Sequence, residues 1–303
     1  MNAFTVRPLS SALGAEVLGL DLAHPIDEAT LKALHEAWMQ HLVLLFRGQT
    51  LSDPALERFS ARFGPLDRKP VYSDAVLDTT TSDYVCVISN VKVDGQPIGD
   101  LGDGEAVWHT DMSYNELPPL GAALYALEVP SGPGGETGFS NMYRAYETLP
   151  HALRQRIRHL QCKHDATRNS AGGLRRGMSE ARDPRESPGA VHPMVRTHPV
   201  TGRDALYLGR RHNAYIVGLP LAESEALLDQ VWAHAAQLQF SWHHAWRAGD
   251  VLLWDNRCVM HRRNSFDPAA RRVMHRTQIQ GDKPVFRARP RDAVAAGIDA
   301  TAQ

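Results

Sequence analysis

Apolar residues recur along the chain with two periods, one typical of helices and one typical of strands. After Asp27, apolar positions such as Leu34 and Trp38 have helical spacing and predict a helix over residues 27–41. The unbroken apolar run 42–46 predicts a buried strand that ends in a turn. The same reasoning predicts helices over residues 56–63, around 149–157 and over 223–236, and strands over residues 4–6, 15–21, 84–89, 121–129, 194–197, 205–208, 239–242, 250–254 and 273–280.

The order of these elements indicates a fold class. Strands outnumber helices and do not alternate with them, so a doubly wound parallel sheet is not expected. The glycine-rich segments also lack the spacing of dinucleotide-binding and P-loop motifs. We therefore expect a mainly β protein with flanking helices, built as an antiparallel double-sheet barrel with the helices packed on one side. A chain of 303 residues is long enough for one large domain, and we expect residues 1–303 to form one.

Two stretches break the regular pattern. Residues 67–107 have a weak period and many Gly and Asp residues, and residues 166–192 are rich in Gly, Arg, Ser and Pro. Long irregular segments inside a compact domain usually carry function. We expect both to border an active site, the second as a lid. Residues 290–303 are small and polar, which predicts a flexible tail.

Composition excludes several classes of partner and location. The 33 Lys and Arg residues balance 34 Asp and Glu residues, so neither nucleic acid nor an anionic membrane is expected as a partner. No apolar stretch is long enough to cross a bilayer, and the N-terminus lacks a signal-peptide pattern. The cysteines Cys86, Cys162 and Cys258 are far apart and odd in number, which indicates reduced thiols and a cytoplasmic location.

Candidate metal chemistry begins with the segment Trp108-His109-Thr110-Asp111. Residues two apart in a strand point to the same side, so His109 and Asp111 are able to aim at one point. A second imidazole would complete the two-histidine, one-carboxylate set that suits iron(II) oxygenases. The chain has 15 histidines, however, and a His-X-Asp pair at the surface remains an alternative on these residues alone.

A second segment is more specific. An apolar strand at residues 249–254 leads into a polar Asp-Asn-Arg turn and then His261, and Arg272 follows eleven residues later. Arg272 and Arg276 alternate onto one strand face, and the planar guanidinium binds carboxylates in a bidentate way. A salt bridge within the fold is the alternative for either arginine. Four motifs occur in order: His-X-Asp, Trp-Asp-Asn-Arg, the following His261 and then Arg272. This order and spacing are hard to obtain by chance.

These motifs resemble those of the taurine dioxygenase (TauD/TfdA) family, which includes the 2,4-dichlorophenoxyacetate and aryloxyalkanoate dioxygenases. The resemblance covers nearly the whole chain. It is carried by residues 13–17, 41–49, 62–66, 108–111, 134–137, 192–199, 254–260 and 271–283.

The resemblance implies a fold, cofactors and site residues. The family fold is the double-stranded β-helix, or jelly roll. The family uses Fe(II), with 2-oxoglutarate as co-substrate and O2, and releases succinate and CO2 while it hydroxylates the substrate. The implied roles are iron ligation by His109, Asp111 and His261, binding of the distal carboxylate of 2-oxoglutarate by Thr137 and Arg272, and binding of the anionic group of the substrate by Arg276.

The departures from the family pattern concern the substrate. Taurine-specific members carry histidines after the Phe-Gly motif, where residues 67–69 here are Asp-Arg-Lys, so taurine is not expected. The segment 208–212, Leu-Gly-Arg-Arg-His, resembles herbicide-type members and implies that His212 binds substrate. Our main hypothesis is a dioxygenase that hydroxylates a small anionic molecule such as an aryloxyalkanoate, sulfonate, sulfate or related carboxylate.

Two other hypotheses remain. The same chemistry on an amino-acid derivative or natural-product intermediate is suggested by the long lid. A non-catalytic jelly-roll binding protein would need an incomplete set of metal ligands, and the intact set argues against it. Members of this family commonly form dimers or tetramers, and the resemblance therefore implies a homo-oligomer, either a dimer or a tetramer.

Overall fold

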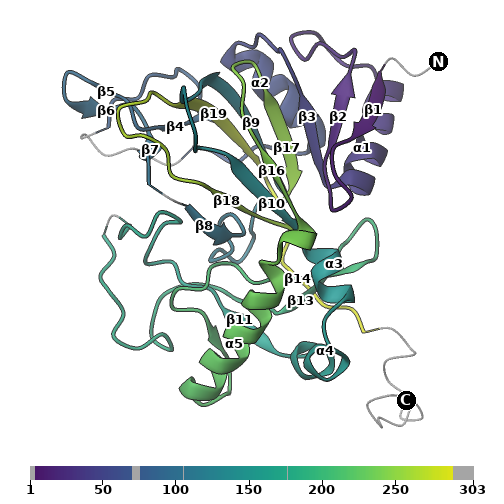
Figure 1. Ribbon diagram of the computed structural model, residues 1–303, viewed down its shortest axis with the longest axis vertical. Coiled ribbons are helices and arrows are strands. Elements are labelled where there is room, and N and C mark those ends of the chain that lie inside the picture. The colour runs from purple at the N-terminus through teal and green to yellow at the C-terminus, as the bar shows by residue number, and fades with distance from the viewer. Residues whose placement is uncertain (1–3, 70–75, 105, 176, 289–303) are drawn as a thin grey trace.

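The computed structural model describes residues 4–69, 76–104, 106–175 and 177–288, and it is mainly β, as predicted (Figure 1). Its largest sheet has eight strands in the order β1-β2-β3-β17-β9-β19-β4-β7. These strands are β1 (Thr5–Pro8), β2 (Ala15–Leu18), β3 (Val43–Phe46), β17 (Val251–Asp255), β9 (Gly121–Glu128), β19 (Val273–Ile279), β4 (Cys86–Ser89) and β7 (Asp100–Leu101).

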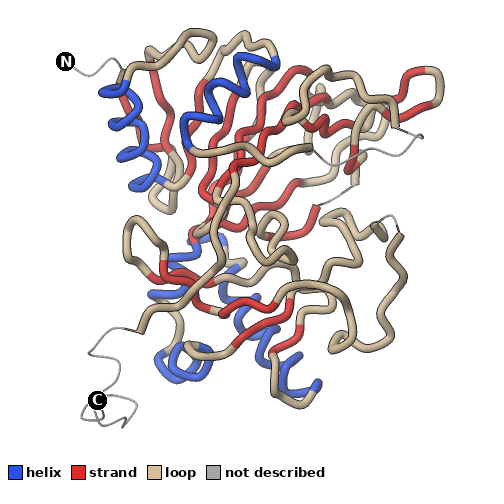
Figure 2. Tube along the Cα trace, turned by 180° about the vertical axis from the view of Figure 1, so that it is seen from behind, coloured by secondary structure: helices blue, strands red, loops and turns tan. Residues whose placement is uncertain are grey.

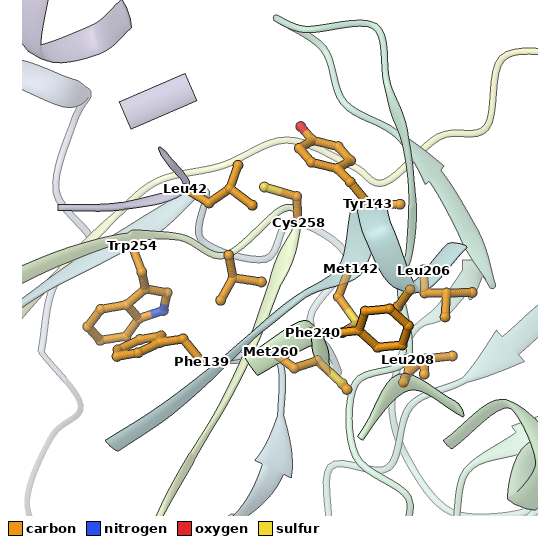
Figure 3. Packing of buried hydrophobic residues seen from close by; sticks show 14 of the residues in the cluster. Leu42, Phe139, Met142, Tyr143, Leu206, Leu208, Phe240, Trp254, Cys258 and Met260 are labelled. Carbon is orange, nitrogen blue, oxygen red and sulfur yellow. The ribbon is translucent and has the colours of Figure 1, made fainter. Parts of the chain in front are cut away.

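A second, four-stranded sheet lies against the first. Its order is β16-β10-β18-β8, with bounds β16 (Ser241–His244), β10 (Thr137–Asn141), β18 (Val259–Arg263) and β8 (Ala106–His109). Apolar side chains fill the space between the sheets: the rings of Phe139 on β10 and Trp254 on β17 lie 5.8 Å apart between centroids (Figure 3). The two sheets therefore share one core.

The unbroken apolar run at β3 arises because both faces of the large sheet are covered. Val43 and Leu45 face the core shared with the second sheet, while Leu44 and Phe46 face the first two helices. A strand buried on both sides needs apolar residues at every position, so its sequence shows no alternation.

The helices flank the β core in two places. Helices α1 (Glu28–His41) and α2 (Asp53–Ser60) cover the outer face of the large sheet, and the Asp27 side chain caps α1 by accepting a 2.8 Å hydrogen bond from the Thr30 N–H group. A separate layer lies below the sheets (Figure 2). It contains α3 (Met142–Glu147), α4 (His151–Ile157), α5 (Leu221–Ala235), β11 (Gln161–Lys163), β12 (Val191–Pro193), β13 (Val195–Thr197), β14 (Asp204–Leu206) and β15 (Tyr215–Ile216).

The expectation that all helices pack on one side is therefore wrong. The lower layer is formed by the chain between β10 and β16, residues 142–240. This segment is long enough to bury its own apolar side chains, including Leu227 and Leu228 of α5, so it forms a second packed layer rather than a loop.

Most predicted elements are present, with shifted ends. The helix predicted around 149–157 is α4, which begins at His151 directly after Pro150, and α3 precedes it as a separate helix that was not predicted. The helix predicted over 56–63 begins at Asp53 and closes with a 3-10 turn at Ala61–Phe63, and a second such turn covers Leu238–Phe240. Strand β10, Thr-Gly-Phe-Ser-Asn, was not predicted because only one of its side chains is large and apolar.

The irregular segment 67–107 contains more structure than its sequence indicates. Besides β4, which lies within the strand predicted over 84–89, it includes β7, the start of β8 and a small hairpin formed by β5 (Lys92–Val93) and β6 (Gln96–Pro97). The predicted tail, residues 290–303, lies outside the described residues.

The cysteines agree with the sequence-based expectation. Cys86, Cys162 and Cys258 are all buried and free of disulfide bonds. Within the described ranges, no helix combines the length and apolar character that crossing a membrane requires.

We predict that Leu45→Ala lowers the free energy of unfolding by about 2–5 kcal/mol, because Leu45 is fully buried between the sheets. Leu238→Ala is the matched control: this side chain is 80% exposed, and its loss should change stability by less than about 0.5 kcal/mol. Equilibrium denaturation in urea measures both, and equal effects of the two substitutions would contradict the assigned core.

Candidate active site

Two histidines and one aspartate converge where β8 pairs with β18. Antiparallel pairing sets His109 directly opposite His261, with ring centroids 4.1 Å apart. Asp111 lies two residues past His109, and its Oδ1 atom is 3.5 Å from His109 Nε2 and 3.9 Å from His261 Nε2. All three side chains are buried. The structure therefore brings together the three residues predicted to ligate a metal.

The protonation of these groups suits metal binding. His109 donates from Nδ1 to the carbonyl oxygen of Val107 at 2.7 Å, which leaves the Nε2 lone pair directed at Asp111. Burial, with the neighbouring His109, lowers the pKa of His261 to about 3, so this imidazole is neutral at pH 7. Burial by itself would raise the pKa of Asp111, but Arg276 and the two histidines hold it well below its usual range. An imidazole with a free lone pair and an ionised carboxylate are ligands that fit a divalent ion such as iron(II).

Asn256 holds the backbone of Asp111 in place. Its Oδ1 atom accepts from the Asp111 N–H group at 2.9 Å, and its Nδ2 atom donates to the carbonyl oxygens of Asp111 at 3.0 Å and Pro119 at 2.9 Å. Asn256 follows β17 directly, so the end of this strand fixes the carboxylate-bearing turn. The polar Asp-Asn-Arg sequence indicates a turn, but it does not reveal this partner.

A cavity lies beside the three converging side chains. It holds about 480 Å³ of empty space, including the part that opens to solvent. The lining residues are Ile88, Ala106, His109, Leu124, Thr137, Ser170, Trp254, His261, Arg263, Arg272 and Arg276.

Arg272 and Thr137 have the properties of a carboxylate clamp. Arg272 is 2% exposed, and its buried Nε and Nη1 atoms have no hydrogen-bond partner among the described residues. Burial, together with the nearby charge of Arg263, lowers the pKa of Arg272 to about 9. Thr137 Oγ1 accepts a 2.9 Å hydrogen bond from Trp246 Nε1, which leaves the hydroxyl proton for a ligand. An anion bound here would compensate the buried charge.

Arg276 faces the same cavity as Arg272, as the strand alternation predicts. Its Nη1 atom donates to Asp111 Oδ2 at 3.5 Å, so this guanidinium lies next to the metal ligands. His275, between the two arginines, points to the opposite face, where its Nδ1 atom is 2.5 Å from Asp53 Oδ1 on α2. Arg272, directly before β19, and Arg276, on β19, thus bring two cations to one cavity.

The structure does not bring His212 to this cavity. His212 is exposed, whereas Arg210, two residues earlier, is buried. Gly209 adopts a left-handed φ of +65°. Its carbonyl oxygen accepts a hydrogen bond from the N–H group of Thr110, the residue between His109 and Asp111. Because the chain turns at this glycine, Arg210 rather than His212 is directed inward, and the substrate-binding role expected for His212 is not supported by its position.

Sequence reasoning missed two cavity residues of note. Arg263 lies two residues after His261 on β18, so strand alternation would have placed both on one face. Ser170 comes from the irregular segment 166–192, and its carbonyl oxygen accepts from the Val107 N–H group at 3.0 Å. No sequence signal identifies this contact of Ser170, which joins the predicted lid to β8.

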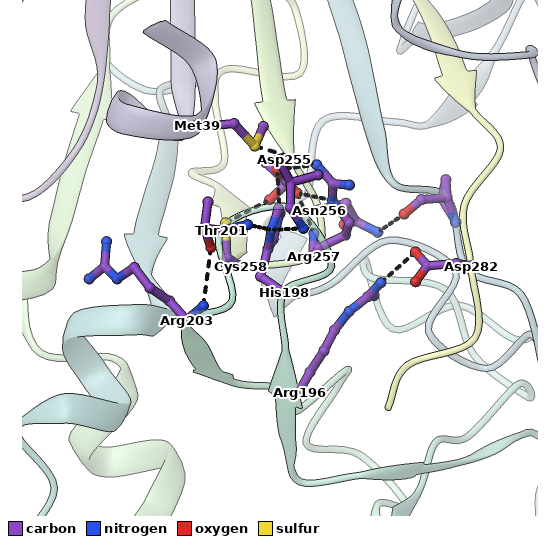
Figure 4. A network of polar contacts seen from close by, with 12 residues as sticks. Met39, Arg196, His198, Thr201, Arg203, Asp255, Asn256, Arg257, Cys258 and Asp282 are labelled. Carbon is purple, nitrogen blue, oxygen red and sulfur yellow. Dashed lines mark hydrogen bonds and ion pairs between the residues drawn. The ribbon is translucent and has the colours of Figure 1, made fainter. Parts of the chain in front are cut away.

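A second cluster of potential ligands, His198, Asp255 and Cys258, is structural (Figure 4). His198 Nε2 donates to Asp255 Oδ2 at 3.0 Å, while its Nδ1 atom accepts from the N–H groups of Val200 and Thr201. Both nitrogens are therefore used, and burial raises the pKa of the Cys258 thiol well above its usual value. These groups join β17 to the lower layer.

Comparisons with known proteins agree with this site. The sequence profile of the taurine catabolism dioxygenase TauD, TfdA family matches residues 5–278. The (S)-phenoxypropionate/alpha-ketoglutarate-dioxygenase of Sphingobium herbicidovorans is 35% identical over 285 residues, which cover 92% of this chain and 96% of the relative. Pentalenolactone F synthase of Streptomyces avermitilis is 31% identical, with 93% and 96% covered. A crystal structure of AAD-2 in complex with Mn(II) and N-oxalylglycine aligns with a TM-score of 0.74 at 28% identity, covering 93% of this chain and 99% of that one.

The chain is thus a 2-oxoglutarate-dependent dioxygenase, a class that uses Fe(II), 2-oxoglutarate and O2. It belongs to the TauD/TfdA family.

We predict that Asn256→Ala weakens Fe(II) binding about 10- to 100-fold, because the backbone of a metal ligand loses its support. Anaerobic titration calorimetry measures this affinity. Asn264→Ala, which removes an amide bonded to Glu136 and Arg262 instead, should leave it unchanged. Equal Fe(II) affinity in Asn256→Ala and the unmodified protein would refute the positioning role.

Proposed function

We propose that this chain hydroxylates a small anionic organic molecule, whose acidic group Arg276 binds beside the iron. The observation that carries the proposal is that Arg272, directly before β19, and Arg276, on β19, line one cavity with His109 and His261, beside Asp111. Two guanidiniums in one cavity suit two carboxylates or similar anions, one from the co-substrate and one from the substrate.

The protein's own groups bind and orient the reactants. His109, Asp111 and His261 hold iron(II), and Thr137 and Arg272 hold the distal carboxylate of 2-oxoglutarate. Iron(II), when bound, supplies the redox chemistry by which O2 converts 2-oxoglutarate to succinate and CO2 and places one oxygen atom in a C–H bond of the substrate. The remaining cavity wall, from Leu124 and Trp254 among others, is apolar and excludes water.

We infer further that the facing eight- and four-stranded sheets form a double-stranded β-helix, or jelly roll, within a single catalytic domain. Support comes from the shared core between the sheets and from the likeness to a solved relative. Residues 67–107 and 166–192 supply cavity residues, among them Ile88 and Ser170, which supports their role as active-site loops and lid. That the protein assembles as a homo-oligomer remains a prediction.

Aryloxyalkanoates are the first substrates to test. The relative from Sphingobium herbicidovorans is named for phenoxypropionate, a carboxylate attached to an aromatic ether. Sulfonates, sulfates and related carboxylates carry the same charge that Arg276 would bind. An amino-acid derivative or natural-product intermediate is the second candidate, favoured by the similarity to pentalenolactone F synthase.

We expect the protein with Fe(II) and 2-oxoglutarate, without O2, to show a weak visible charge-transfer band. Asp111→Ala should lose both the band and turnover, because the metal loses its carboxylate ligand. Asp229→Ala, which removes an exposed carboxylate on α5, should retain both. Absence of the band and of 2-oxoglutarate turnover in the unmodified protein would reject the proposed chemistry. Unchanged behaviour of Asp111→Ala would favour a non-catalytic binding protein.

Arg276→Met should lower kcat/KM for the substrate about 10- to 100-fold through loss of a charge-assisted hydrogen bond, with a smaller effect on 2-oxoglutarate affinity. The assay scores succinate release together with product formation over a panel of aryloxyalkanoates, alkylsulfonates, alkyl sulfates and N-acyl amino acids. Arg271→Met is the control, because Arg271 is largely exposed and pairs with Glu128. A panel in which Arg276→Met matches the unmodified protein would exclude the substrate role of Arg276.

A further inference from the structure

The cavity contains one more cation than the proposed function uses. Its wall includes three guanidinium groups, those of Arg263, Arg272 and Arg276. Arg276 lies beside Asp111 and serves the substrate, and Arg272 serves 2-oxoglutarate. Arg263 is 5% exposed. Burying a cation carries a desolvation penalty unless a hydrogen-bond acceptor or an anion compensates its charge.

The strand register places Arg263 at the co-substrate end of the cavity. In the pairing of β10 with β18, Thr137 stands directly opposite Arg263, while Phe139 stands opposite His261. Arg263 is therefore the cross-strand neighbour of the threonine in the proposed clamp. Arg263 and Arg272 line the same cavity.

The surroundings of the two guanidiniums differ. Within the part of the chain that the structure describes, the buried Nε and Nη1 atoms of Arg272 have no hydrogen-bond partner. Arg263 Nη2 donates to the carbonyl oxygen of Gly104, and the Asp103 carboxylate stabilises its charge. Gly104 precedes β8, so Arg263 also ties the approach to this strand. A structural role and a binding role are thus both present on one side chain, and an experiment has to separate them.

A carboxylate at this end of the cavity has enough acceptor capacity for both cations. Its two oxygens offer about four lone-pair sites. Arg272, directly before β19, Arg263 on β18 and Thr137 on β10 all line this cavity. One anion would reduce the repulsion between two neighbouring buried positive charges, and a neutral group would leave that repulsion in place.

We propose that Arg263 is a second cation for the distal carboxylate of 2-oxoglutarate, acting with Arg272 and Thr137, and that it makes the pocket selective for oxo acids with two carboxylates. This inference rests on the proposed function. It assigns to Arg263 a role in co-substrate specificity in addition to its contact with Gly104.

The test compares two oxo acids of equal chain length. 2-Oxoglutarate carries the distal carboxylate, and 2-oxopentanoate has a methyl group in its place. Each is titrated into the Fe(II)-loaded protein without O2, and binding is followed by the charge-transfer band and by calorimetry. Arg263→Met should weaken 2-oxoglutarate binding about 10- to 100-fold, the loss typical of a charge-assisted hydrogen bond, and should change 2-oxopentanoate affinity less than about threefold.

Two further variants complete the design. Arg262→Met alters the neighbouring residue of β18, which lies outside the cavity lining and contacts Trp108 and Asn264, and should leave both affinities unchanged. Arg263→Lys keeps the charge and should retain most of the preference for 2-oxoglutarate. It also keeps the test decisive if Arg263→Met fails to fold, since a Lys variant without that preference would contradict a role for the charge.

The outcomes separate the two roles of Arg263. Equal weakening of both oxo acids in Arg263→Met would assign Arg263 to structure alone and overturn the proposal, as would unchanged 2-oxoglutarate affinity. If the unmodified protein binds 2-oxoglutarate with the expected band, the proposed function stands whatever the Arg263 variants show. If it binds none, the proposed function fails and this inference fails with it.

Discussion

The site depends on the antiparallel pairing of β8 with β18. This pairing sets His109 opposite His261 and, through the turn that follows β8, brings Asp111 to the same point. Strand β18 is fixed on its other edge by β10, which also carries Thr137. A shift of one residue in this register would turn each inward side chain outward, so the metal ligands and the carboxylate clamp depend on the same hydrogen bonds.

Buried charge is the second constraint. The cavity wall includes three guanidiniums, and the Asp111 carboxylate lies beside it. Such an arrangement is costly in a low-dielectric interior, and anionic ligands lower that cost. The positive wall therefore explains why an oxo-dicarboxylate and an anionic substrate suit one cavity. It also explains why Asp111 stays ionised although it is buried.

The β-sheets and the lower layer contribute different residues to the site. His109, His261, Arg263 and Arg276 lie on strands, where hydrogen bonding fixes their geometry, while Asp111 lies in the turn after β8 and Arg272 directly precedes β19. The segment 142–240 packs below the sheets. From this segment, Ser170 lines the cavity and the carbonyl oxygen of Gly209 accepts a hydrogen bond from the Thr110 N–H group. Loops tolerate sequence change more readily than strands. Relatives named for unlike molecules, phenoxypropionate and pentalenolactone F, are consistent with a constant metal site under a variable cover.

The sequence by itself determined the features that follow from local spacing. The spacing of His109 and Asp111 predicted that they meet, although the turn after β8, rather than a continuous strand, brings Asp111 to His109. Arg272 and Arg276 are four residues apart, an even spacing that agrees with their shared cavity. Helix α1 follows from apolar period and capping, and strand β3 follows from an unbroken apolar run. Only the tertiary structure decided that Asn256 supports Asp111, that Arg210 replaces His212 on the inner side, and that β10 is a strand. These depend on contacts between residues far apart in the chain, and such contacts leave no period in the local sequence.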